Sequence, residues 1–120
     1  MRRILLDQNA PLGLRQILTA YDVKTAYDMG WDMIANGRLL SAAEAAGFAV
    51  MVTSDQNIAH QQNLSGRRIA LVVLTTNHWL TVKGNASTVL EACDKAGEGT
   101  YTVVQFPLPP RRRRPATPQS

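Results

Sequence analysis

Two uninterrupted apolar runs constrain this sequence more than any other feature. Residues 48–53 read Phe-Ala-Val-Met-Val-Thr, and residues 69–74 read Ile-Ala-Leu-Val-Val-Leu. A strand with one face in water alternates apolar and polar side chains, whereas a continuous apolar run is typical of a strand buried on both faces of a parallel sheet. Both runs are too short to span a bilayer. We therefore expect an α/β protein with no contact with membranes.

Shorter patterns predict the remaining elements. Apolar residues at helical spacing indicate a helix that starts near Pro11 and a long helix over residues 77–96. Between them, Asn36 is the expected N-cap of a helix that ends at Gly47 in a left-handed cap. Further strands are expected at residues 3–6, 22–25 and 101–104. This alternation predicts a single α/β domain with a mostly parallel central sheet and helices on both faces.

The basic charge of the chain is concentrated at its end. Four consecutive arginines account for the net charge of +4, since residues 1–110 carry nine basic and nine acidic side chains. Proline lacks a backbone N–H and fixes φ, so the five prolines around these arginines predict an extended tail over residues 107–120, after a domain of residues 1–106. The candidates for contact with nucleic acid or a partner are therefore Arg111, Arg112, Arg113 and Arg114.

The cysteine content and the first residues both favour a cytoplasmic protein. Cys93 is the single cysteine, so no internal disulfide can form, and its place on an apolar helical stripe predicts an inert core residue. The apolar run before Asp7 is only three residues long, whereas a secretory signal needs about 7–15.

Polar clusters follow three of the expected strands, and two of them contain an aspartate. Right-handed crossovers bring the carboxyl ends of parallel strands to one edge, so Asp7 and Asp55 should lie there together with neighbouring amides. Carboxylate and carbonyl oxygens are the ligands that Mg²⁺ or Mn²⁺ accepts. An aspartate directly before a helix is also the ordinary cap for backbone N–H groups. The residues alone leave metal binding and capping open.

Several segments resemble a family of small bacterial PIN-like domain proteins. The matching segments lie in order with the right spacing over roughly residues 2–106: residues 4–9, 39–48, 50–57 and 61–70. The family is regarded as Mg²⁺-dependent ribonucleases and is often proposed as the toxin half of toxin–antitoxin operons. The resemblance implies a PIN-like fold with an acidic metal site at the carboxyl edge of the sheet.

The resemblance also implies roles for individual residues. Asp7 matches the first-strand acid and Asp55 the acid after a threonine, so both are expected to be catalytic metal ligands. Asn36 stands where relatives usually carry aspartate, and Asn57 where PIN-type motifs often have a further acid. An amide brings no charge, so we expect weak Mg²⁺ or Mn²⁺ binding with these two as auxiliary ligands. Glu44 is a weaker candidate, because most helix glutamates face solvent.

The function implied is metal-assisted hydrolysis of RNA by a possible toxin. A rival hypothesis is a catalytically weak PIN-like module that binds an antitoxin protein or RNA, and a third is an interaction protein whose acids only cap helices. The family also implies a homodimer. Large apolar residues near predicted loops agree with self-association: Trp31, Met33, Ile34 and Trp79.

Overall fold

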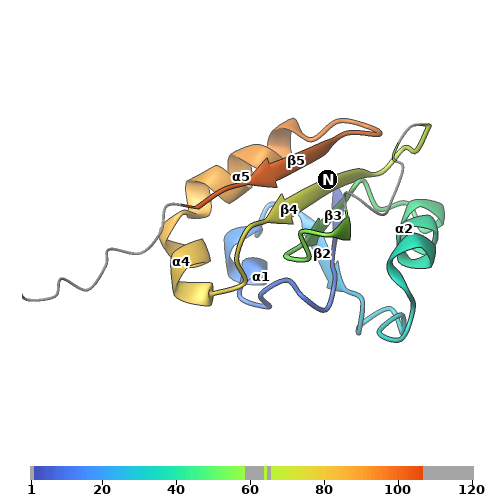
Figure 1. Cartoon of the computed structure of the whole chain (residues 1–120), viewed down its shortest axis with the longest axis horizontal. Helices are drawn as coiled ribbons and strands as arrows, with labels where there is room; N and C mark the ends of the chain where they lie inside the picture. Colours follow the sequence, from blue (N-terminus) through green and yellow to red (C-terminus); the bar gives the residue numbers. More distant parts are fainter. Residues whose placement is uncertain (1, 59–63, 65, 107–120) are drawn as a thin grey trace, which may run out of the picture.

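The computed structural model describes residues 2–58, 64 and 66–106, which form an α/β fold around a five-stranded, all-parallel sheet (Figure 1). The expected fold class is confirmed at this level. The elements are β1 (Arg3–Leu6), α1 (Leu14–Ile17), β2 (Asp22–Thr25), α2 (Asn36–Ala45), β3 (Val50–Thr53), β4 (Ala70–Leu74), α4 (Trp79–Gly84), α5 (Ala86–Lys95) and β5 (Tyr101–Val104).

The strands lie in the order β2-β1-β3-β4-β5, so β1 sits between β2 and β3. Residues Ile4 to Leu6 of β1 pair in parallel with Val50 to Val52 of β3. The two apolar runs of the sequence become β3 and β4, every residue of which is buried. The prediction that these runs form strands covered on both faces is confirmed.

Helices cover the two faces of the sheet unequally. α1, α4 and α5 pack on one face, where Leu14, Val82 and Val89 join a core cluster with alternate residues of the strands. α2 packs on the other face, through Leu40 and Ala43 (Figure 1). Among the helices of the described residues, one therefore packs on this face and three pack on the opposite face.

Two arginines at the start of β1 fasten helices on opposite faces of the sheet. The guanidinium of Arg2 donates to the carbonyl oxygens of Cys93 and Ala96 at the end of α5, each at 2.6 Å. Arg3 donates to the carbonyl of Ala46 at the end of α2 and lies 4.2 Å above the ring of Phe48. Cations at a helix C-terminus satisfy its last carbonyls and oppose its dipole.

Two helix predictions were wrong in extent. Residues 77–96 do not form one helix, because the backbone breaks at Asn85 (φ −122°, ψ 34°) between α4 and α5. The side chain of Asn85 donates to the carbonyl of Thr81, a local bond that competes with helix geometry, and Gly84 adds flexibility. The helix expected from Pro11 is only the short α1, although Leu14 and Leu18 are buried on the predicted face.

The expected ends of α2 were half correct. The helix begins at Asn36, but Ala35 is its N-cap residue, so the N-cap prediction for Asn36 was wrong. Gly47 follows the helix with φ +89°, as the left-handed cap requires.

Two further expectations concern the C-terminal tail and the absence of membrane spans. The tail prediction for residues 107–120, with its four arginines, falls outside the described residues. Within the described part, no helix combines the length and the apolar character needed to cross a membrane.

We predict that Arg3→Ala lowers the free energy of unfolding by about 1.5–3 kcal/mol, the usual contribution of a hydrogen bond that involves a charged group. The substitution removes the bond to the end of α2, the ring contact with Phe48 and a 3.2 Å ion pair with Asp22. Urea unfolding measures the change. Arg38→Ala is the matched control, because Arg38 is exposed on α2 and a surface substitution of this kind usually changes stability by no more than about 0.5 kcal/mol. Equal effects of the two substitutions would contradict the prediction.

Candidate functional site

The strand order reverses between β1 and β3, so their carboxyl ends form the switch point of the sheet. In parallel α/β sheets, ligands bind outside these ends at such a switch point. Asp7 directly follows β1, and Asp55 lies two residues after β3 ends at Thr53. The sheet therefore brings the two predicted acids to one edge, as the sequence analysis expected.

Asp7 is a buried carboxylate with three hydrogen-bond donors around it. Its Oδ1 accepts the backbone N–H groups of Asn9 (2.9 Å) and Ala10 (3.1 Å), and its Oδ2 accepts the hydroxyl of Thr53 at 2.5 Å. Only 4% of the residue is exposed. Burial raises the pKa of Asp7 above its ordinary value, the three hydrogen bonds oppose that effect, and the charge of Asp55 raises the pKa further.

The Thr53 hydroxyl connects the two acids. It donates to Asp7 and accepts the backbone N–H of Asp55 at 3.0 Å, so one side chain fixes the carboxylate on β1 and the turn after β3. Asp55 in turn accepts the N–H of Asn57 at 3.0 Å. Both acids therefore cap the turns that follow their strands, and they also influence each other electrostatically. The sequence analysis missed the role of Thr53, and its only signal was a threonine at the end of a strand.

A small pocket of about 90 Å³ opens beside Asp7. Its wall includes Asp32, which the sequence analysis did not select, together with Trp31 and the first apolar residue of α2, Leu39. The remaining residues of the wall are Gln8, Asn9 and Ile34. A half-buried acid beside Asp7 could have been suspected only from the Trp31-Asp32 pair, because no strand or helix pattern marks it.

The predicted auxiliary ligands have different positions. Asn57 is exposed, and its backbone N–H donates to the Asp55 carboxylate. Asn36 is the first residue of α2, whose Leu39 borders the pocket of Asp7, while the side chain of Asn36 lies outside the described part of the structure.

The structure does not support Glu44 as a ligand. Its carboxylate accepts the backbone N–H of Arg68 and forms an ion pair with Arg67 at 3.5 Å, just before β4 begins. This is the amino edge of the sheet, opposite Asp7 and Asp55. The hydrogen bond from Arg68 is the main reason that the pKa of Glu44 is lowered. Glu44 therefore fastens α2 to the entry of β4.

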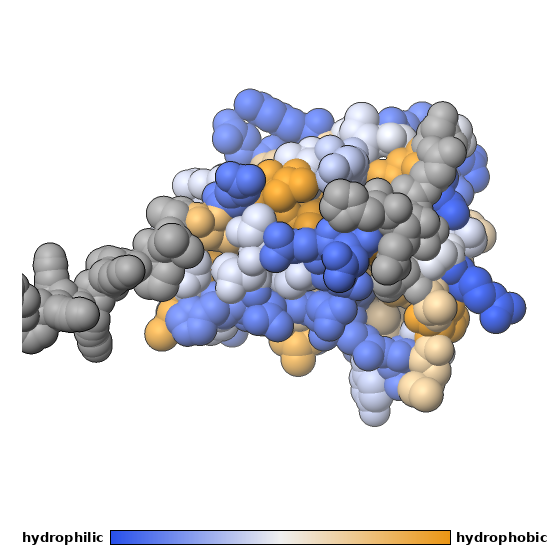
Figure 2. Space-filling model, in the orientation of Figure 1, coloured by the Kyte–Doolittle hydropathy of each residue, from blue (hydrophilic) through white to orange (hydrophobic). Residues whose placement is uncertain are grey.

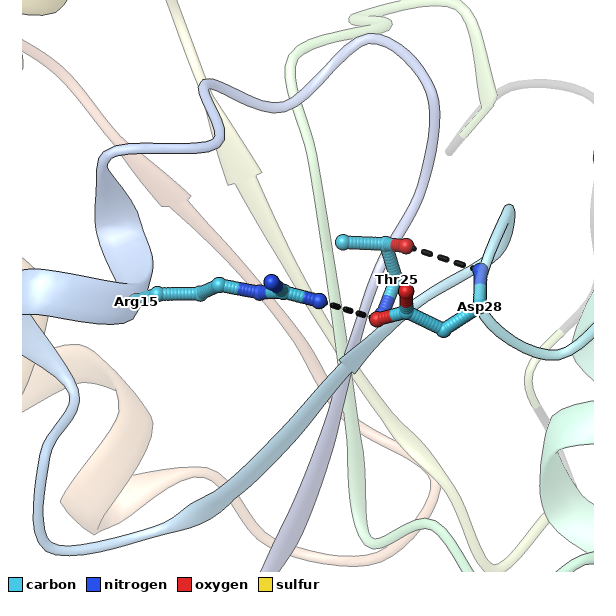
Figure 3. Close-up of polar contacts among 3 residues, drawn as sticks. All are labelled: Arg15, Thr25 and Asp28. Atoms are coloured by element: carbon cyan, nitrogen blue, oxygen red, sulfur yellow. Dashed lines mark hydrogen bonds and ion pairs between the residues drawn. The ribbon is translucent and has the colours of Figure 1, made fainter.

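A further acid, Asp28, has a structural role after β2 (Figure 3). Asp28 accepts the backbone N–H of Thr25 at 2.9 Å and donates its own N–H to the Thr25 hydroxyl at 3.0 Å. Arg15 of the segment α1 also pairs with the Asp28 carboxylate. The hydrogen bond from Thr25 is the main cause of the lowered pKa of Asp28. This acid closes the turn after β2.

Proteins bind Mg²⁺ through one or two carboxylates together with waters and substrate phosphates, so Asp7 and Asp55 are the residues that could hold such an ion. The mutual repulsion of Asp7 and Asp55 is a cost that a nearby cation would relieve. Among the described residues, no group of three or more His, Cys, Asp or Glu side chains is arranged to hold a metal ion. Two carboxylates are therefore the charged donors on which such a site would depend.

Comparison with known protein families, curated proteins and solved structures finds no match to this chain. The PIN-like assignment therefore stays a prediction from the sequence.

We predict that Asp7→Asn gains stability relative to the wild type as the pH rises from about 4 toward neutrality. A carboxyl whose pKa is raised by folding stabilises the fold below its unfolded pKa, and this contribution is lost as the pH rises through the folded pKa. Asparagine keeps an oxygen for the N–H groups of Asn9 and Ala10 and carries no charge to bury. Urea unfolding of both proteins across this range measures the difference. A difference that stays constant with pH would contradict the raised pKa.

Proposed function

We propose that this chain is a PIN-like, Mg²⁺-dependent ribonuclease that hydrolyses phosphodiester bonds at the carboxyl edge of its sheet. The observation that supports it best is the pair of Asp7 and Asp55, joined by Thr53 at the strand switch point, with one of the two acids almost fully buried. The resemblance of the sequence to PIN-like proteins supplies the substrate class.

In this proposal Asp7 and Asp55 hold the metal, with Asn36 and Asn57 as auxiliary candidates. The metal supplies Lewis acidity and a water of lowered pKa for attack on phosphorus. Thr53 keeps the Asp7 carboxylate in one orientation through its hydroxyl. The backbone N–H groups of Asn9 and Ala10 donate to the second oxygen of Asp7, so the acid is positioned before any ligand arrives.

A catalytically weak binding module is the second candidate, and one observation favours it. Three donors already use the Asp7 carboxylate, and the pocket beside it holds about 90 Å³, which is small for a nucleotide. Under this reading the same edge of the sheet would bind RNA or an antitoxin protein without cleaving RNA.

We expect Asp7→Asn and Asp55→Asn each to lower Mg²⁺- or Mn²⁺-dependent cleavage of a labelled single-stranded RNA by about 100-fold or more. A bound metal lowers the activation barrier of such a reaction by several kcal/mol, and each 1.4 kcal/mol changes the rate tenfold. Asn36→Asp should tighten Mg²⁺ binding, measured by metal-dependent thermal shift, because it adds a charge near the start of α2. Asp94→Asn, on the exposed side of α5, is the matched control and should leave cleavage unchanged.

Cleavage that survives both substitutions at Asp7 and Asp55 would refute the metal site. A wild-type protein that binds RNA but shows neither cleavage nor any response to metal would support the binding module.

The described part of the chain ends, at Phe106, at the same edge of the sheet as the acid pair. β5 is parallel to the other strands, so its carboxyl end lies at the carboxyl edge. Phe106 is fixed there, since its N–H donates to the Thr75 hydroxyl at 3.3 Å and its ring packs against the core. The four arginines begin five residues later and can therefore reach RNA phosphates near Asp7 and Asp55.

We predict that removing residues 107–120 preserves the fold but weakens RNA binding and flattens its dependence on salt. Neutralisation of one phosphate by each arginine contributes about −0.7 to the slope of log K against log[salt] for a single strand, so about −3 is lost in total. A variant with Gln at all four arginine positions separates charge from length and should behave like the truncation. An unchanged slope would make the tail a linker.

A further inference from the structure

The two edges of the sheet differ in how well they are protected. The β2 edge carries the charged residues Asp22 and Lys24, which discourage pairing with another strand. The β5 edge, with the sequence Tyr-Thr-Val-Val, carries no charge, and its first three residues are exposed. A strand of strong β-formers with an open edge is a template for pairing with another strand.

The apolar side chains of β5 are also uncovered on one face. Tyr101 and Val103 lie beside Leu71 and Val73, so they point to the face that α2 covers only in part. They are 48% and 42% exposed, whereas Val104 is buried on the opposite face. Figure 2 shows hydrophobic surface over the region where Figure 1 draws β5.

The backbone of the same two residues faces outward. The carbonyl oxygens of Thr100 and Val104 accept N–H groups of Leu71 and Thr75, so these alternate residues bond to β4. The alternation turns the N–H and C=O groups of Tyr101 and Val103 to the free edge. No strand of the described chain lies on that side of β5.

The groove beside this edge has balanced charge. α5 and β5 enclose about 370 Å³, and the charged residues of the wall are Glu91 and Lys95, which pair with each other at 3.1 Å. A strongly acidic or strongly basic partner would be attracted by one of these two charges and repelled by the other. A second copy brings the opposite charge to each of them when the two α5 helices run antiparallel.

We propose that the chain forms a homodimer in which β5 pairs antiparallel with β5 of a second copy, around a two-fold axis at Thr102. Residues opposite each other in an antiparallel pair share a face of the sheet, so this axis sets each Tyr101 against Val103 of the other copy. Both exposed apolar side chains are then covered, and their outward backbone groups form four hydrogen bonds. This inference does not depend on the proposed nuclease activity.

The two tryptophans that suggested self-association from the sequence pack within the chain, whereas Met33 is 91% exposed. Trp31 packs edge-on against Phe48, with ring centroids 6.1 Å apart, and Trp79 lies against Gly13. The tryptophans are thus used within the chain. The edge of β5, in contrast, is a surface that can pair with the same edge of a second copy.

Light scattering coupled to size exclusion of the full chain at micromolar concentration should give a mass twice the 13.2 kDa of one chain. Val103→Lys should convert it to a monomer with unchanged circular dichroism, because the lysine would face apolar surface and the second copy. Leu80→Lys is the matched control: Leu80 is 69% exposed on α4, away from β5, and its substitution should leave the dimer intact.

Disulfide trapping tests the axis itself. An axis at Thr102 places the two copies of that residue opposite each other at a non-hydrogen-bonded position, about 4.5 Å apart, which a disulfide can span. Thr102→Cys should therefore cross-link as a dimer under a mild oxidant such as diamide. Ser87→Cys, exposed at the start of α5, should not, and the native Cys93 is buried.

A monomeric wild-type protein at high micromolar concentration would overturn the proposal. So would a dimer that persists in Val103→Lys, or one that Thr102→Cys fails to cross-link, since either result would place the interface elsewhere.

Discussion

The parallel pairing of β1 with β3 is the constraint on which the rest of the structure depends. It places β1 between β2 and β3 in the sheet. It also aligns Asp7 with the end of β3, where the N–H of Asp7 donates to the carbonyl of Val52 at 3.1 Å. Once that register is set, the Thr53 hydroxyl meets the Asp7 carboxylate without any further adjustment. A slip of one residue would turn every side chain of β1 to the wrong face.

The same geometry unites the two interpretations of the acids that the sequence left open. Asp7 and Asp55 do cap the turns after their strands, and the charge of Asp55 also raises the pKa of Asp7. A carboxylate that caps a turn at the end of a parallel strand is already held at the ligand-binding edge of the sheet. Capping therefore supplies the rigidity that a binding site at this edge requires.

The sequence predicted the strands well because their signal is local and strong. The buried runs at β3 and β4 could hardly form anything else, and the parallel arrangement followed from the alternation of elements. Helix limits were less predictable, since Asn85 breaks its helix through a side-chain bond that spacing does not reveal. The role of Thr53 and the position of Asp32 were not predictable, because both arise from contacts between segments far apart in the chain. The pairing of Glu44 with Arg67 was not predictable for the same reason, since Arg67 precedes another strand.

The anchoring of Arg2 to the end of α5 has a consequence for how the chain folds. Its bond to the carbonyl of Cys93 joins residues 91 positions apart, and β1 lies inside a sheet whose other strands follow it in sequence. Structures dominated by such distant contacts fold slowly, because the chain loses the entropy of loop closure before the contact contributes any stabilising free energy. At about 5–20 residues per second, the ribosome needs roughly 5–20 s to make the partner of Arg2. Both strands that pair with β1 lie in the first half of the chain, so β1 can enter the sheet early, whereas the attachment of Arg2 to α5 must wait for the second half.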